Sequence, residues 1–118
     1  MCGIFGYIGP KNNAAQLVLE GLKKLEYRGY DSWGIAIGNR YQATGNRNRI
    51  TVEKHTGKIA DANLSSVFRH LSSGFALGHT RWATHGGVTN VNAHPHLDCT
   101  GKIAIIHNGK IIENNSRQ

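Results

Sequence analysis

MCGIFGYIGP occupies residues 1–10, and its alternation of glycine with apolar and aromatic side chains is typical of a β-strand over residues 3–8. Gly9 and Pro10 follow and end this strand. The first residues of most domains are poorly ordered. A strand that begins so close to the start of the chain therefore predicts that its first residues are part of the fold.

Further strands and two helical stretches follow. Apolar residues recur at helical spacing from Ala14 to Leu25, after a cap at residue 12 or 13, and Arg28-Gly29 offers a glycine stop that ends this helix near Tyr27. The apolar positions of residues 59–71 suit a second, short helix. We expect strands at residues 33–38, 50–54, 75–82 and 102–109. Runs of strands with only two helices predict an α+β layered domain.

Length, charge and cysteine content exclude several classes of protein. The 118 residues form one domain at most, and no apolar run approaches the ~20 residues of a membrane span. No signal peptide is apparent, so we expect a cytoplasmic protein without a membrane partner. The two cysteines are too few for a disulfide scaffold. The net charge of +7 comes from scattered Lys and Arg without a nucleic-acid motif, which predicts a solvated basic surface and no specific nucleic-acid partner.

Cys2 is the first candidate for chemistry. If Met1 is removed, Cys2 carries the free α-amine beside its thiol, and an amine that titrates near ~8 can accept the thiol proton at neutral pH. The alternative is a small buried apolar side chain. A thiolate that attacks a carbonyl also needs donors for the oxyanion, which the Asn108 carboxamide and the Gly109 N–H can supply. The same dipeptide also makes hairpin turns.

The segment GHTRWATHGG, residues 78–87, is the second candidate. Arg81 provides a two-pronged donor for a carboxylate, and Trp82 provides an apolar wall. Short polar side chains surround them, namely Thr80, Thr84 and His85. Two structural alternatives remain open, because Arg81 could pair with an internal acid or stack on Trp82.

Seven histidines raise the question of a metal. His94 and His96 lie two residues apart and could share a strand face, with His79 and His85 as further ligands. The usual zinc patterns are absent, and Cys99 has no CxxC partner. We therefore expect histidines that are satisfied by hydrogen bonds, with no metal and no cofactor.

Five blocks of the sequence match a known family in order and spacing: MCGIFGYIG, LEYRGYDSWGIAI, GHTRWATHG, NAHPH, and HNG followed after one residue by IIEN. The chain resembles the N-terminal glutaminase domain of the glutamine-fructose-6-phosphate aminotransferases. These are class II glutamine amidotransferases of the N-terminal-nucleophile hydrolase superfamily. Amidophosphoribosyltransferases and asparagine synthetases look similar at the cysteine start, but YRGYDS and HTRWATHG point to the aminotransferases.

The resemblance implies an αββα sandwich that hydrolyses the glutamine side-chain amide to glutamate and ammonia. Cys2 would form a γ-glutamyl thioester with its own α-amine as base, while Asn108 and Gly109 would form the oxyanion hole. Arg81 would bind the glutamine α-carboxylate. The resemblance also implies that Trp82, Thr84 and His85 belong to a loop that closes over glutamine, with His94 nearby as a further substrate-binding residue. Arg28 and Gly29 would help to hold the N-terminal residue in place.

The chain also departs from the family. The family's sugar isomerase region, which accepts the ammonia, is not in the sequence, so we expect residues 1–118 to be an incomplete glutaminase domain without an isomerase domain. Lys110 interrupts the family pattern HNGIIEN, and the acid that holds the glutamine α-amine would lie beyond Gln118. The alternative function is a non-catalytic remnant that binds glutamine or a partner. Strands without partners also predict a homo-oligomer.

Overall fold

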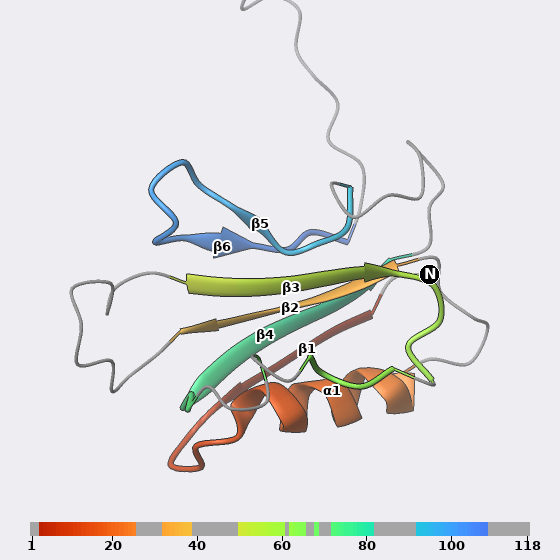
Figure 1. Ribbon diagram of the computed structural model, residues 1–118, viewed down its shortest axis with the longest axis horizontal. Helices are drawn as coiled ribbons and strands as arrows, with labels where there is room; N and C mark the ends of the chain where they lie inside the picture. The colour runs from red at the N-terminus through yellow and green to blue at the C-terminus, as the bar shows by residue number, and fades with distance from the viewer. Residues whose placement is uncertain are drawn as a thin grey trace, which may run out of the picture.

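The computed structural model describes residues 3–25, 32–38, 50–60, 62–65, 68, 72–81 and 92–108. They form three layers: a helix, a four-stranded antiparallel sheet and a small two-stranded sheet (Figure 1). The large sheet has the order β1-β4-β2-β3, with bounds β1 Gly3–Ile8, β2 Ser32–Gly38, β3 Ile50–Thr56 and β4 Phe75–Arg81. The expected α+β fold class is confirmed, and the chain holds only part of the sandwich.

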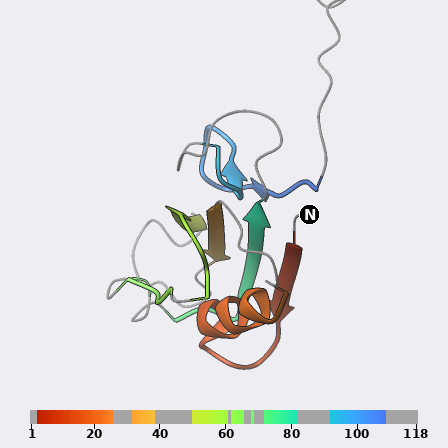
Figure 2. The ribbon, with the colours of Figure 1, turned by 90° about the vertical axis from the view of Figure 1, so that its right-hand side faces the viewer.

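The helix α1, Ala14–Leu25, covers one face of the large sheet, and Figure 2 shows it below the strands. The centre of its apolar side is fully buried, with Val18 and Leu22 at 0% exposure. Glycines on both elements allow the close approach. A Cβ on Gly78 would lie 2.5 Å from Val18 Cγ1, and a Cβ on Gly21 would lie 2.5 Å from the Phe5 ring. This layer holds most of the hydrophobic core.

The second sheet lies over the opposite face of the large sheet. It pairs β5, His96–Leu97, with β6, Ala104–Ile105. The turn between them is closed by the Asp98 carboxylate, which accepts the backbone N–H groups of Lys102 and Ile103 at 2.9 Å each. The turn also contains Gly101 with a φ of 74°, which favours glycine. The Gly101 carbonyl also accepts the Ile50 N–H at 2.7 Å, so the turn of this β5–β6 hairpin is held both by its own hydrogen bonds and by β3.

Gly34 allows the hairpin segment to reach the large sheet. A side chain on Gly34 would overlap the carbonyl oxygen of His94 and would lie 3.1 Å from Pro95 Cδ. At the other end of the same face an apolar groove of about 380 Å³ lies between the large sheet and Ala104. Ile8 borders this groove and is 79% exposed. The two ends of this face thus differ, one closely covered and the other open.

Most sequence-predicted elements are confirmed within two residues. These are the strands expected at residues 3–8, 33–38, 50–54 and 75–82, and the first helix, whose Leu17 N–H donates to the Asn13 carbonyl at 3.1 Å. The expected helix end near Tyr27 and the final strand residue Trp82 lie outside the described residues. The strand expected at 102–109 is reduced to Ala104–Ile105, and β5 was not predicted.

The second helix, expected over residues 59–71, is wrong in its first part. Residues 62–65 are not helical, while Phe68 is. The Glu53 carboxylate accepts the Ser65 N–H at 3.2 Å, and the Ser65 hydroxyl accepts the Phe68 N–H at 3.2 Å. Ser65 thus occupies an N-cap position relative to Phe68, which fits the non-helical conformation of residues 62–65.

Candidate functional site

One end of the large sheet carries Arg81, a candidate residue of the sequence analysis, together with the start of β1. Gly3 pairs with Thr80, and Ser32 pairs with Arg81. The Gly3 N–H also donates to Thr80 Oγ1 at 3.1 Å, which anchors the start of β1. Cys2 lies outside the described residues, but the residue that follows it is fixed beside the strand end that bears Arg81.

Three histidines from different elements meet on the hairpin side of this end. His79 belongs to β4, His94 precedes β5 and His96 begins it. The rings of His79 and His94 stack with centroids 4.4 Å apart, and those of His94 and His96 are tilted with centroids 4.5 Å apart. Lys54 Nζ lies 3.4 Å from His96 Nδ1. We call His79, His94 and His96 the histidine cluster.

Asn108 is held against this cluster. His79 Nε2 lies 2.8 Å from Asn108 Oδ1, and the preceding N–H, that of His107, donates to His94 Nδ1 at 3.3 Å. His79 is paired with Ile4 on β1. The contact therefore places the Asn108 carboxamide beside β4, and the strand next to β4 is β1, which starts directly after Cys2.

The histidine cluster is neutral at pH 7. Burial lowers the pKa of His79 to about 4 and is also the main cause that lowers the pKa of His94 to about 4. Burial, the Lys54 ammonium and the Arg81 guanidinium lower the pKa of His96. The positive charge of Arg81 contributes to all three shifts, while the hydrogen bond to Asn108 acts in the opposite direction on His79. Neutral rings can stack in a buried place, whereas charged rings would repel one another and would lose their hydration there.

The arrangement suits an anionic ligand better than a metal. Arg81 and Lys54 bring positive charge to the cluster, and no acid among the described residues contributes to the histidine pKa shifts. A carboxylate or a developing oxyanion is favoured in such a field. Within the described parts of the chain, no group of three or more His, Cys, Asp or Glu side chains could hold a metal ion.

The structure describes three of the predicted site residues, and it brings Arg81, His94 and Asn108 together around His79. The other seven lie outside the described residues, and their roles stay predictions: Cys2, Arg28, Gly29, Trp82, Thr84, His85 and Gly109. The same holds for Lys110.

Sequence reasoning missed the contact between His79 and Asn108. His79 was considered only as a metal ligand, because pairs of histidines are the visible signal in a sequence. The useful signal would have been the position of His79 in the strand FALGHTR, whose alternation places it on the face away from α1. A buried histidine on that face needs a polar partner.

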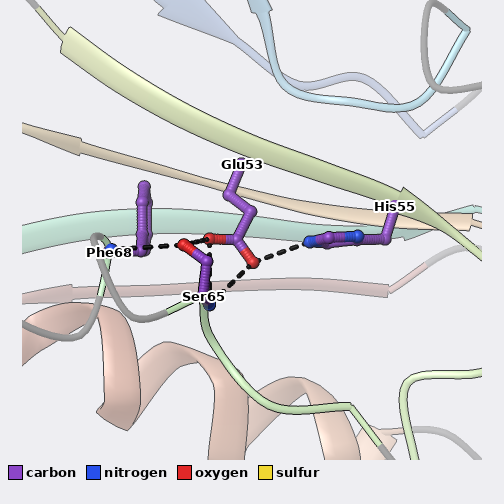
Figure 3. A network of polar contacts seen from close by, with 4 residues as sticks. All are labelled: Glu53, His55, Ser65 and Phe68. Carbon is purple, nitrogen blue, oxygen red and sulfur yellow. Dashed lines mark hydrogen bonds and ion pairs between the residues drawn. The ribbon is translucent and has the colours of Figure 1, made fainter.

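A second polar cluster lies on the other face of the sheet and has a structural role (Figure 3). Glu53 accepts the Ser65 hydroxyl at 2.7 Å and lies 2.7 Å from His55 Nε2. Serine, histidine and a carboxylate are present, but the carboxylate lies between the other two. His55 therefore cannot take a proton from Ser65, and the cluster ties residues 62–65 to β3.

Comparisons with known proteins now bear on this geometry. One similar solved structure is the glutamine phosphoribosylpyrophosphate amidotransferase from B. subtilis in complex with ADP and GMP. The match covers 83% of this chain and 19% of the amidotransferase chain, with a TM-score of 0.61 and 26% sequence identity. Sequence identity with glutamine–fructose-6-phosphate aminotransferase [isomerizing] is 53% for Pyrococcus horikoshii and 54% for Chlamydia trachomatis, each over 97% of this chain. No protein-family model matches the chain.

The fold and its similarity to a solved amidotransferase thus place the chain among the amidotransferases of the N-terminal-nucleophile class. Within this class, the chain belongs to the glutaminase-domain family of the glutamine-fructose-6-phosphate aminotransferases. It spans 17% to 18% of the length of the curated relatives it matches. In the described part of the chain, no helix has the length and apolar character needed to cross a membrane.

Proposed function

We propose that the chain is a glutaminase module that hydrolyses the side-chain amide of L-glutamine. The Cys2 thiolate attacks the amide carbon, and a carbon–sulfur bond forms. As the carbon–nitrogen bond breaks, the α-ammonium of Cys2 returns the proton to the leaving nitrogen, which departs as ammonia. Water then cleaves the γ-glutamyl thioester to glutamate and regenerates the thiol.

The observation that carries this proposal is the placement of Asn108. Its carboxamide is bound by a fully buried histidine at 2.8 Å, on the strand that pairs with the one starting directly after Cys2. An oxyanion hole needs a donor that is held in place before the charge develops. Arg81 stands at the same end of the sheet and supplies a positive charge for the α-carboxylate of glutamine.

The intact mass of the protein tests the proposal, before and after exposure to a glutamine-like diazoketone that alkylates nucleophilic cysteines. We expect loss of Met1 and a single adduct on Cys2, which excess glutamine prevents. The same preparation releases ammonia from glutamine, and Cys2→Ala abolishes this release. Turnover that survives Cys2→Ala would remove the nucleophile assignment.

Cys99 offers a matched control, because it is a free and exposed cysteine far along the chain from Cys2. Cys99→Ala should leave both the adduct and ammonia release unchanged. An adduct on Cys99 that glutamine does not prevent would reveal exposure to the reagent rather than an active site. A protein that keeps Met1 and takes no adduct would contradict the proposal.

A non-catalytic module that binds glutamine or a partner is the second candidate. The open apolar groove on the hairpin side favours it, since Ile8 and Phe75 border the groove with 79% and 39% exposure. Such a surface suits contact with another polypeptide. Glutamine binding by calorimetry without ammonia release or an adduct would favour this candidate.

The ammonia acceptor in this proposal is a sugar isomerase domain or subunit, as the names of the matched relatives suggest. We place the module in the cytoplasm, where a cysteine nucleophile stays reduced. The proposal includes a homo-oligomer, which light scattering tests; a monomeric mass of a folded sample would exclude it. We also propose that residues 1–118 belong to a single, incomplete glutaminase domain.

A further inference from the structure

We propose that His79 is a positioning residue that fixes the orientation of the Asn108 carboxamide for the oxyanion. The inference rests on the proposed hydrolysis of glutamine. A carboxamide has a donor end and an acceptor end, and the two are related by a simple flip. Only the NH₂ end stabilises an oxyanion, whereas the oxygen end would repel it. Something must therefore select one orientation, and the 2.8 Å contact from His79 Nε2 to Asn108 Oδ1 does so.

The tautomer of His79 follows from its surroundings. Its other ring nitrogen, Nδ1, is buried and makes no well-formed hydrogen bond within the described residues, while the ring also hydrogen-bonds to the backbone of His107, which acts to raise its pKa. A proton on Nδ1 would leave a buried donor unsatisfied and would set two lone pairs, those of Nε2 and Asn108 Oδ1, against each other. The proton therefore sits on Nε2, which donates to Asn108 Oδ1 and turns the amide nitrogen away from the ring.

The histidine ring is itself held in place, which a positioning role requires. His79 is fully buried and stacks on His94, with ring centroids 4.4 Å apart. His94 accepts the backbone N–H of His107, the residue directly before Asn108. The backbone and the side chain of the 107–108 segment are thus fixed by two neighbouring rings, so the carboxamide is set before any substrate arrives.

Two substitutions distinguish the effect of the Nε2–H donor from the effect of the packed histidine ring. His79→Phe keeps a flat ring for the stack on His94 and removes the donor, while His79→Gln returns an N–H near the position of Nε2. We expect His79→Phe to lower the kcat for glutamine by about 10- to 100-fold, with KM changed less than about 3-fold, and His79→Gln to recover most of the loss. His55→Phe, the same change on the other face of the sheet, should leave both constants unchanged.

A double-mutant cycle tests whether His79 acts through Asn108. Asn108→Ala alone should lower kcat by about 10²- to 10³-fold, as loss of one oxyanion donor does. His79→Phe should then add less than about 2-fold in the Asn108→Ala background, because the group it positions is gone. The proposal would be overturned if His79→Phe lowered kcat by the same factor with and without the Asn108 side chain. It would also be overturned if His79→Phe raised KM and left kcat unchanged.

Nitrogen NMR of the unsubstituted protein keeps the inference testable even if a variant does not fold. We expect the His79 ring to be neutral with its proton on Nε2 from pH 5.5 to 8. A proton on Nδ1 overturns the inference whatever the activity. A protein that shows the Nε2–H tautomer but neither hydrolyses glutamine nor takes the diazoketone overturns the proposed function instead, so the two failures are distinguishable.

Discussion

The two faces of the large sheet are built from the same four strands and differ in almost every other respect. The face toward α1 is closed by apolar side chains and by glycines that admit the helix, such as Gly78. The face toward the β5–β6 hairpin carries the histidine cluster at one end and an open apolar groove at the other. Strand alternation alone separates the two sets of side chains.

The difference teaches that stability and candidate chemistry are divided between the faces. Leu22 and Val18 exclude water on the α1 face, where burial of apolar surface stabilises the fold. His79 on the hairpin face is equally buried but polar, and burial there costs free energy unless partners are present. Substitutions on the two faces should therefore give different kinds of loss.

The largest effect on stability is expected on the α1 face. Leu22→Ala should lower the free energy of unfolding by about 2–5 kcal/mol, because it leaves a cavity in a fully buried layer. Leu25→Ala, on the same helix but 36% exposed, should cost no more than about 1 kcal/mol. Urea denaturation measures both. If the fraction that stays folded lost its kcat for glutamine, the two faces would not be independent.

A smaller loss is expected where the hairpin contacts the sheet. Gly34→Ala should lower the free energy of unfolding by about 1–3 kcal/mol, because its methyl group would overlap the His94 carbonyl and displace the backbone. It should also disturb the stack on His79. Gly6→Ala is the matched control, since it lies on the same face and its Cβ would have its nearest neighbours at 3.6 Å. Equal thermal stability of the two variants would contradict the close approach.

The sequence predicted the four long strands and α1 better than it predicted the β5–β6 hairpin that covers the other face of the sheet. Periodicity identified α1 and the four long strands, because each has enough residues to show a period of 3.6 or 2. β5 has two residues and exists only through its pairing with β6, so no local pattern could reveal it. Arg81, His94 and Asn108 were predicted from their chemistry and from the family resemblance. The part played by His79 depends on a partner 29 residues away.

Acid should weaken the hairpin face selectively. The folded pKa values of His79 and His94, about 4, lie below the ordinary value of 6.5, so the unfolded chain binds more protons between these limits. The free energy of unfolding should therefore be constant above pH 7 and fall by about 3 kcal/mol from pH 7 to pH 4, mainly through buried His79, with a smaller contribution from the partly exposed His94.

His79→Gln removes one of these titrating groups and should make the fall in stability shallower. The Asp98 carboxyl acts in a different window, because its hydrogen bond with Thr100 is the first of the causes that lower its pKa to about 2. Its contribution is lost only as the pH falls below its ordinary value of 3.8. Thermal melts from pH 4 to pH 8 thus report the histidines, and a flat profile would contradict their neutral, buried state.

The smallest effect is expected at the edge of the α1 face, where Ser65 binds Glu53 and caps the backbone N–H of Phe68. Ser65→Ala should lower the free energy of unfolding by about 1 kcal/mol, the usual cost of a lost N-cap. Ser65→Asp keeps a capping oxygen but sets it against the Glu53 carboxylate, so it should rescue less than Ser65→Thr. None of these three changes should alter kcat, because this cluster lies on the face away from His79 and Asn108. A loss of turnover in Ser65→Ala would mean that the two faces are coupled through β3.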